Sequence, residues 1–334
     1  LLHENIKEEY KLFLQTLLDY KQNQKLLTAF IQKLPSEVKE DGCIHGRFNQ
    51  IGTATGRFSS SDPNLQQLPS RAGDIRGMFC AREGNIIIGS DYSQIEVRVT
   101  ASFSKDPTML HAYETGEDLY SKMASEIHGL PYEACMEFNP ITGELQKEGK
   151  KLRSNTKSIL LGLLYGRQAK SIGEQINVPE KEAQELVDSF FKSFPKIKEL
   201  DKITKLGASQ NGYITTICGR KRRLPDIKSR DKWSKARAER QCLNAMIQGS
   251  SADCMKLAMI SIHNNKRLRE LNAKLVLTVH DEVEIECPVE HAKEVADIMT
   301  TIMKDIGENL FNIKMKCDEE FMFRWGEPID IDNL

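Results

Sequence analysis

The sequence predicts an α+β fold in which an antiparallel sheet is interrupted by a long helical segment. A short β-branched run at residues 86–89 is typical of a buried strand. Residues 274–279 and 283–287 alternate apolar and polar side chains on either side of a polar turn, as in a β-hairpin. From Glu117 to Leu206 the patterning is mainly helical. Strands separated in this way indicate one sheet with a helical subdomain inserted into it.

The flanking segments complete this outline. An amphipathic helix is expected from Ile6 to Leu34; because it has no start signal and the chain has no initiating Met, we expect a longer parent chain. Asp91 leads into a helix-like segment that contains Ile95, Val97 and Val99. The remaining expectations are a loop-rich stretch after Pro35, a loop insertion at 139–143, helices at 236–268 and 289–306, and a mixed tail.

Composition excludes several classes of protein. The 334 residues include 47 basic and 48 acidic side chains and 40% hydrophobic residues, so wholesale disorder is not expected. No apolar run is long enough for a membrane helix, and eight scattered cysteines without a C-x-x-C pair indicate reduced thiols rather than a disulfide framework. The near-zero net charge hides a local excess, because residues 220–240 contain ten basic and three acidic side chains.

Two aspartates at the ends of predicted strands form the first candidate site. Asp91 follows the strand at 86–89, and Asp281 lies in the turn of the predicted hairpin. Each has an ordinary explanation, Asp91 as a helix N-cap and Asp281 as a turn residue. Together they could meet across neighbouring strands, where two carboxylates repel and need a cation. Oxygen ligands suit Mg²⁺, and two ions about 3.5–4 Å apart form the clamp for in-line phosphoryl transfer.

A stripe of functional side chains is predicted on the helix that resumes near Lys150. Arg153, Lys157, Leu161 and Tyr165 are spaced by four residues and share one helical face. The stripe is either a solvated charged face or a triphosphate clamp, in which Arg gives forked hydrogen bonds and Lys a point charge. Tyr165 adds a flat surface for a base. Spacing alone leaves both interpretations open.

Two further polar groups suit contacts to nucleic acid. The loop at residues 53–60 carries hydroxyls, a glycine and Arg57, and Asn64 and Gln66 follow it. Such donors can reach phosphates and minor-groove acceptors, although the stretch alone is more typical of a polar surface loop. The second group is spaced by four on one helical face, which could line a groove or simply be exposed. It consists of Arg240, Asn244 and Gln248.

Taken together, these segments resemble the family A DNA polymerases, the bacterial DNA polymerase I type that also occurs in phages. Asp91–Arg98 (D-Y-S-Q-I-E-V-R) resembles the first motif of the family, and Arg153–Gly166 has the R-x3-K-x7-Y-G spacing of the second. Val279–Glu282 (V-H-D-E) resembles the third. Residues 53–64 and 220–227 also resemble family segments, so the likeness covers the chain from about residue 35 onward in matching order.

The resemblance implies a right-hand polymerase core with an antiparallel-sheet palm that is interrupted by helical fingers. The implied bounds are 1–34 for the end of the thumb, 35–104 for the first part of the palm, 105–237 for the fingers and 238–334 for the second part of the palm.

The resemblance also implies a two-metal-ion nucleotidyl transfer. Asp91 and Asp281 would bind two Mg²⁺ ions, for which Mn²⁺ can substitute, and the main-chain carbonyl of Tyr92 would assist. Glu282 would lie beside the metal site, and Lys157 would help the pyrophosphate to leave. Glu96 would lie under the sugar and exclude a 2′-hydroxyl. The residues implied to bind the nucleotide are Tyr92, Gln94, Glu96, Arg153, Lys157, Leu161 and Tyr165. Those implied to contact primer–template DNA are Arg57, Asn64, Gln66, Arg240, Asn244, Gln248 and His280.

Three features depart from the family pattern. Leu161 stands where the family usually has Phe or Tyr, so either it packs the fingers or it replaces an aromatic platform under the sugar. Tyr120 occurs where a His commonly helps to hold phosphate. An insertion at about residues 137–149 lengthens the approach to the fingers helix.

The implied partners are primer–template DNA and dNTPs, without a membrane, in the cytoplasm of a bacterial cell or a phage-infected host. An upstream thumb or exonuclease region and replisome factors are further possible partners. A single-subunit RNA polymerase relative is disfavoured by Glu96, because a gate against the 2′-hydroxyl defeats RNA synthesis. A non-catalytic DNA-binding remnant is disfavoured because Asp91, Asp281, Arg153, Lys157 and Tyr165 are all present.

Overall fold

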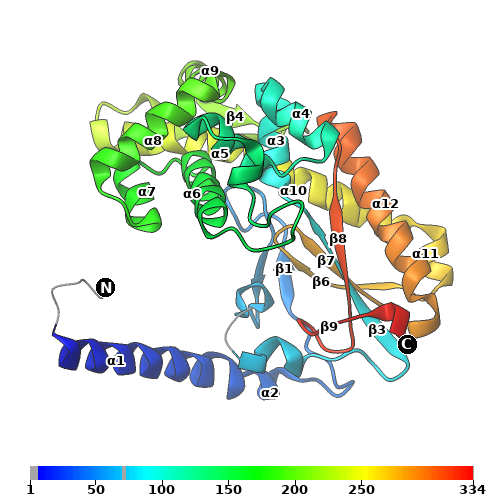
Figure 1. Ribbon diagram of the computed structural model, residues 1–334. Coiled ribbons are helices and arrows are strands. Elements are labelled where there is room, and N and C mark those ends of the chain that lie inside the picture. Colours follow the sequence, from blue (N-terminus) through cyan, green and yellow to red (C-terminus); the bar gives the residue numbers. More distant parts are fainter. Residues whose placement is uncertain (1–6, 70–72, 334) are drawn as a thin grey trace.

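A five-stranded antiparallel sheet organises the computed structural model, which describes residues 7–69 and 73–333 (Figure 1). The order across the sheet is β6-β7-β3-β8-β9, so β3 lies at the centre. The predicted strand and the predicted hairpin therefore share one sheet, because β3 pairs with β7. The strands are β3 (Asn85–Tyr92), β6 (Lys274–Val279), β7 (Glu282–Pro288), β8 (Cys317–Met322) and β9 (Pro328–Ile329).

Strands β8 and β9 were not predicted, because their residues were assigned to a mixed tail. β8 reads Cys-Asp-Glu-Glu-Phe-Met, and three consecutive acids give no apolar alternation and little β-propensity. The strand forms because it pairs with β3, and in this pairing Asp318 lies opposite Asp91. Non-local pairing thus overrides local propensity here.

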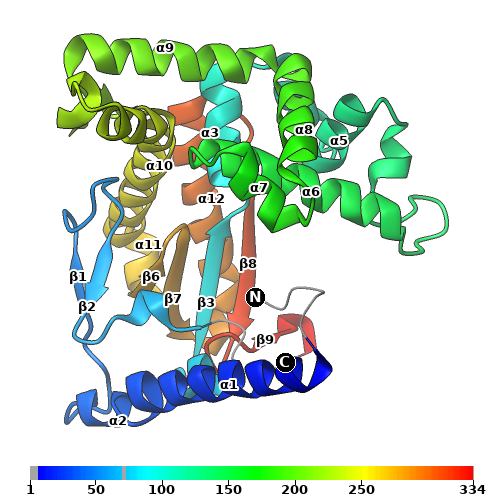
Figure 2. The ribbon, with the colours of Figure 1, turned by 90° about the vertical axis from the view of Figure 1, so that its left-hand side faces the viewer.

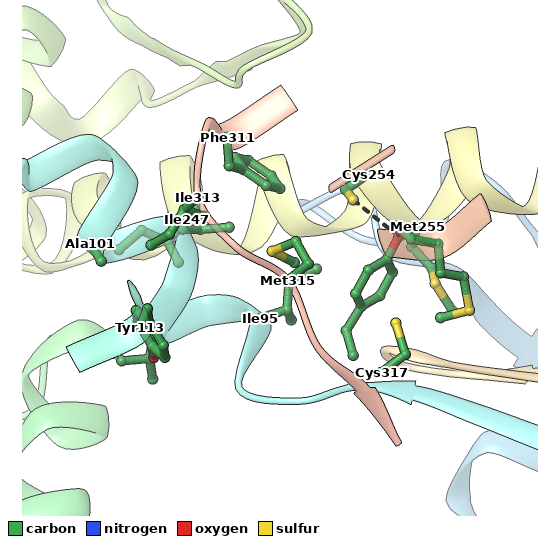
Figure 3. Close-up of a cluster of buried hydrophobic side chains, with 14 of the residues drawn as sticks. Ile95, Ala101, Tyr113, Ile247, Cys254, Met255, Phe311, Ile313, Met315 and Cys317 are labelled. Carbon is green, nitrogen blue, oxygen red and sulfur yellow. Dashed lines mark hydrogen bonds between the residues drawn. The ribbon is translucent and has the colours of Figure 1, made fainter. Parts of the chain in front are cut away.

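One face of the sheet is covered by α12 (Ala292–Phe311), against which α3 (Ile95–Ser104) and α10 (Lys232–Asn264) pack. Strand side chains point alternately to the two faces, so Ile86 and Ile88 of β3 enter the core with these helices, whereas Ile87 belongs to a second cluster on the other face. In Figure 3 side chains of α3, α10 and the segment that enters β8 converge on this core, among them Ile95, Cys254 and Met315. The Tyr92 ring is buried there, and its hydroxyl donates to the carbonyl of Met303 at 2.6 Å.

Between α3 and α10 the chain forms the predicted helical segment, seen above the sheet in Figure 2. Asp106 and Asp118 accept hydrogen bonds from the first backbone N–H groups of α4 and α5, which fixes where these helices begin. The elements are α4 (Pro107–Thr115), α5 (Leu119–His128), α6 (Lys147–Leu164), α7 (Ala169–Ile176), α8 (Glu180–Ser193), α9 (Pro195–Asn211), and the hairpin of β4 (Tyr213–Thr215) and β5 (Lys221–Arg223). We call residues 107–228 the helical lobe.

The predicted loop insertion is a short bridged loop before α6. Phe138 and Leu145 pair in an isolated β-bridge, and the Asn139 side chain accepts hydrogen bonds from the backbone N–H groups of Ile141 and Thr142. Gly143 adopts φ +71°, which closes the turn. The insertion therefore has its own fixed geometry.

The N-terminal segment corrects one expectation. Its helices are α1 (Glu8–Leu26), which continues as a π-helical turn over Leu27–Ile31, and α2 (Leu34–Glu37); a hairpin of β1 (Arg47–Asn49) and β2 (Ser59–Ser61) follows. The predicted start at Ile6 lies outside the described residues. The helix was predicted to be amphipathic, but no residue of α1 whose burial is described is buried, and Leu12 and Phe13 are exposed. Apolar periodicity predicts that a helix has an apolar face, but it does not show that another element packs against that face.

Of the two long C-terminal helices, the first has the predicted length but begins and ends four residues earlier, and the second is two residues longer than predicted. Helix α10 begins at Lys232 because Asp231 caps it, with Ser234 N–H donating to the carboxylate at 2.8 Å, and α11 (Lys266–Glu270) follows it. Helix α12 extends to Phe311 and ends where Asn312 turns to a positive φ. Across the described ranges, no helix is long and apolar enough to cross a lipid bilayer.

A row of acids lies on the face of the sheet opposite α12. Glu282, Glu284 and Glu286 alternate along β7, opposite Asp91, Gly89 and Ile87 of β3. Glu286 pairs with Arg82, whereas neither carboxyl oxygen of Glu284 has a hydrogen-bond partner of ordinary geometry. Glu284 is only 1% exposed. Burial, and next the charge of Glu282, raises the pKa of Glu284 to about 8.

Glu284→Gln should make the protein more stable at alkaline pH. The wild-type carboxyl keeps its proton in the folded state but ionises in the unfolded chain, so raising the pH from about 4.5 to 8 favours unfolding. Gln has no proton to lose, and the advantage of the variant should grow over this range by up to about 4 kcal/mol, then level off. Urea unfolding at pH 5 to 9 measures this difference, with Glu286→Gln as a control that should not gain. Parallel stability curves for wild type and Glu284→Gln would contradict the assignment.

Candidate active site

The two predicted aspartates meet at one end of the sheet. Asp91 is the second-to-last residue of β3 and lies opposite Glu282, and the backbone N–H of Tyr92 donates to the carbonyl of Asp281 at 3.2 Å. The N-cap of α3 is Gln94, so Asp91 is not the helix cap that its sequence position also allowed. His280, with φ +56°, and Asp281 form the turn between β6 and β7.

Negative charge is concentrated around Asp91. Burial, and then the charges of Asp281, Glu282 and Asp318, raises the pKa of Asp91 to about 7. Asp318 belongs to β8, which the sequence analysis missed, so this acid could not be placed beside Asp91 in advance. Such a cluster favours bound cations.

Arg57 supplies one cation to this cluster. Its Nη2 donates to Glu96 Oε1 at 2.8 Å and to Asp281 Oδ1 at 3.1 Å. The side chain therefore joins the loop after β1, the first turn of α3 and the β6–β7 turn. Burial raises the pKa of Glu96, while the charge of Arg57 and hydrogen bonds from Tyr165 and Gln248 oppose that rise.

A second arginine, Arg220, holds the loop that carries Arg57. Its Nε donates to Asp253 Oδ1 at 3.0 Å, and its Nη2 donates to the carbonyls of Thr55 at 2.8 Å and Gly249 at 2.9 Å. A Cβ on Gly56 would overlap the guanidinium carbon of Arg220, so glycine is required for this approach. Arg220 was placed beforehand only in a basic run and in the segment 220–227 that resembles the family, and neither pattern indicated its contacts with Thr55 and Asp253.

Arg153 and Lys157 lie side by side on α6, as their spacing predicts. Arg153 makes a forked ion pair with Asp118, from Nε to Oδ2 and from Nη2 to Oδ1, each at 2.9 Å. The buried ring of Tyr120 lies beneath both cations, with its centroid 5.5 Å from Arg153 Cζ and 5.7 Å from Lys157 Nζ. Tyr120 thus supports two positive charges through its π-face.

Leu161 and Tyr165 end the same helix. Leu161 is half-buried and packs against the main core, and Tyr165 is 45% exposed at the C-cap. Tyr165 is hydrogen-bonded to Glu96, which connects the end of α6 to the carboxylate cluster. Leu161 therefore packs against the core, and the prediction that it also faces a nucleotide stays a prediction.

The stripe on α10 lies along the same region. Gln248 is hydrogen-bonded to Glu96, and Arg240 packs on the backbone of Gly166, where a Cβ would lie 2.6 Å from the Arg240 carbonyl oxygen. Gly166 has φ +71°, so glycine is needed there on two counts. A cavity of about 420 Å³ opens beside Arg240 and is lined by Gly166–Gln168, Lys170, Ser171 and Glu174.

Three predicted residues have their hydrogen bonds elsewhere. Asn64 caps a 3-10 turn through the N–H of Gln66, and the Gln66 amide donates to the carbonyl of Thr278 on β6 at 3.1 Å. Gln94 accepts from the Tyr113 hydroxyl at 3.2 Å. A larger cavity of about 600 Å³, lined by Leu34, Trp325 and others, includes none of the predicted site residues.

The sequence was compared with models of known protein families. The family model described as DNA polymerase family A matches residues 2–327. The chain belongs to this family. The resemblance predicted from the five motifs is confirmed, as is the fold class.

Two curated relatives illustrate the match. The chain is 37% identical over 307 residues to the thermostable DNA polymerase I of Thermus aquaticus, covering 91% of this chain and 35% of the relative. It is 33% identical over 317 residues to DNA polymerase I of Pseudomonas aeruginosa, covering 94% of this chain and 33% of the relative. The chain therefore spans about a third of the length of these relatives.

A solved structure shares the fold. It is the POL domain of Pol1 from M. smegmatis in complex with DNA primer-template and dNTP. The TM-score is 0.84 at 32% identity, and the match covers 94% of this chain and 53% of that chain. The sheet with its inserted helical lobe is thus part of a fold that this solved structure shares.

The Tyr120 ring generates a testable prediction. Tyr120→Leu should weaken binding of inorganic tripolyphosphate about ten-fold, because two cation–π contacts of about 0.5–1 kcal/mol each would be lost. Tyr120→Phe keeps the ring face and should bind within about two-fold of wild type. Isothermal titration calorimetry measures both. Equal losses in the two variants would show that the hydroxyl, rather than the ring, supports the cations.

Proposed function

We propose that this chain is the catalytic core of a template-directed DNA polymerase, which adds dNTPs to a primer 3′ end by nucleotidyl transfer. The observation that carries the proposal is the meeting of Asp91 and Asp281 at one end of the sheet, in a chain whose helix α6 presents Arg153 and Lys157. Relatives named DNA polymerase I, and a similar structure in complex with primer-template and dNTP, support it.

We propose Mg²⁺ as the cofactor, bound by Asp91, Asp281 and the main-chain carbonyl of Tyr92. Among residues 7–69 and 73–333, no group of three or more His, Cys, Asp or Glu side chains gathers into a metal site. Two carboxylates and a carbonyl nevertheless suit Mg²⁺, which commonly keeps waters and binds substrate phosphates. The excess negative charge around Asp91 fits such a role. When bound, two such ions would neutralise charge on the attacking and leaving oxygens.

The residues on α6 would hold the triphosphate. Arg153 and Lys157 would bind phosphate oxygens, and Lys157 would donate a proton to the departing pyrophosphate. Arg153 is already oriented by its forked pair with Asp118. Pre-positioned cations stabilise developing charge without reorganisation during the reaction.

The contacts around Glu96 would select the sugar and the base pair. Glu96, held by Arg57 and Tyr165, would leave no room for a 2′-hydroxyl, and Tyr165 would stack at the nascent pair and template position. Minor-groove acceptors are nearly alike in every correct pair, so donors there check pair shape without reading sequence. The proposed DNA contacts are Arg57, Asn64, Gln66, Arg240, Asn244, Gln248 and His280.

The division of the chain follows from this proposal. Residues 1–34 would end the thumb, 35–104 and 238–334 would form the palm, and 105–237 the fingers. The helical lobe at 107–228 supports the fingers bounds. The polymerase would act in the cytoplasm on primer–template DNA, with an upstream thumb or exonuclease region and replisome factors as further partners.

Asp281→Asn and Asp91→Asn should each lower primer extension by about a thousand-fold, which corresponds to about 4 kcal/mol of transition-state stabilisation. DNA affinity should persist, because it comes mainly from distributed phosphate contacts. Single-nucleotide extension and a filter-binding assay separate the two effects. Glu319→Gln, an exposed carboxylate on β8, is the matched control. Extension near the wild-type rate by Asp281→Asn would remove the basis of the proposal.

Leu161 should determine how the enzyme treats dideoxynucleotides. Leu offers neither a π-face nor a hydroxyl, so wild type should discriminate against a nucleotide that lacks its 3′-OH. Leu161→Tyr should raise the dideoxy-to-deoxy incorporation ratio because its hydroxyl can replace the missing group, whereas Leu161→Phe should not. Competition assays with labelled terminators measure the ratio. The same ratio in all three proteins would mean that Leu161 only packs the fingers.

A further inference from the structure

Helix α10 carries a continuous face that extends beyond the predicted DNA contacts. Arg240, Asn244 and Gln248 fall on one stripe, and steps of three and four residues toward the N-terminus reach Arg237 and Trp233. At 100° per residue these five positions lie within an arc of about 80°. The opposite stripe is buried, and it consists of Ala238, Cys242, Ala245 and Gly249. Trp233 therefore prolongs the face that borders Glu96 at its other end.

Trp233 is unusual for its exposure. The indole is 82% exposed, whereas the other tryptophan of the chain, Trp325, is 3% exposed in the palm. Within the described part of the chain, the side chains of Trp233 and Arg240 make no hydrogen bond or ion pair. A large aromatic surface left in water at the start of a long helix is available to a ligand.

The surroundings of Trp233 are basic. Residues 228–240 contain six basic side chains and two acidic ones. Both acids are already engaged, because Asp231 caps α10 and Glu239 pairs with Lys235 at 3.9 Å. An exposed aromatic ring among basic side chains is the combination with which proteins hold single-stranded nucleic acid.

A cavity with several basic side chains opens at the Arg240 end of this face. The cavity of about 420 Å³ between α7 and α10 is lined by Arg167, Lys170 and Arg240, with Glu174 as the acid. It adjoins Gly166, next to Tyr165, where the proposed function puts the template position. Trp233 lies seven residues before Arg240, or about 10 Å along the helix axis. At the spacing within one strand of a stacked duplex, about 3.4 Å per nucleotide, that distance corresponds to roughly three nucleotides.

We propose that Trp233 is a stacking platform for the single-stranded template ahead of the base being copied. This inference rests on the proposed function, since it takes the α10 face as the primer–template surface. Phosphates of the overhang would lie along Arg240 and Lys170, and a base about three nucleotides ahead would stack on the indole. Every base has a π-face, so the platform accepts any template sequence.

The test compares two primer–templates with the same duplex and with 5′ template overhangs of one or six nucleotides, without dNTP. The longer overhang should quench tryptophan fluorescence in wild type and the shorter one should not, because Trp325 is buried. Trp233→Ala should weaken binding of the six-nucleotide overhang at least about five-fold, the lower bound for losing one base stack, and leave the one-nucleotide overhang unchanged. Trp233→Phe should retain most of the affinity.

Ile260→Ala is the matched control, because Ile260 is 56% exposed near the C-terminal end of the same helix, far from Trp233. Equal losses of Trp233→Ala on both substrates, or no loss on either, would overturn the platform while leaving the proposed function intact. The second result is also expected if a protein covers Trp233. If wild type binds neither duplex, the proposed function fails and the platform falls with it.

Discussion

Repulsion among carboxylates at the end of β3 is the constraint on which the site depends. Asp91, Asp281, Glu282 and Asp318 come together because three neighbouring strands end at the same edge of the sheet. Left uncompensated, such a group would favour protonation or separation of its members. The chain compensates with Arg57, which also binds Glu96 and so couples the acids to helix α3. Through these two contacts Arg57 ties its own loop to the start of α3 and to the β6–β7 turn.

Support for Arg57 comes from a second layer of contacts. Arg220 fixes the carbonyl of Thr55 and meets Asp253 on α10, so the loop and the long helix are joined by one guanidinium. The same helix contacts α3, α9 and α12. Sheet, loop and helical lobe are thus connected through α10 rather than through the strands alone, which explains why so many predicted contacts lie along a single helix.

Local sequence predicted the elements whose signal is local. The β3 run, the β6–β7 hairpin and the stripe on α6 follow from alternation or four-residue spacing, and the structure has each of them. Strand β8 could not be predicted, because its acids are tolerated only through pairing with β3. The forked pair of Arg153 with Asp118 and the Arg220 contacts join residues 29 to 165 positions apart. Contacts of that kind depend on the assembled fold and leave no periodic trace in the sequence.

Tyr92 belongs to the site and to the core at once. Its backbone N–H meets Asp281, while its ring is packed beside Cys254 and its hydroxyl binds the carbonyl of Met303. The geometry of the carboxylate cluster is therefore set partly from the interior, by side chains that never meet solvent. Substitutions selected only to improve the packing of α10 against α12 would shift this backbone as well. Substitutions in this part of the core would therefore change both the stability of the fold and the position of the carboxylates, so these two properties are expected to evolve together.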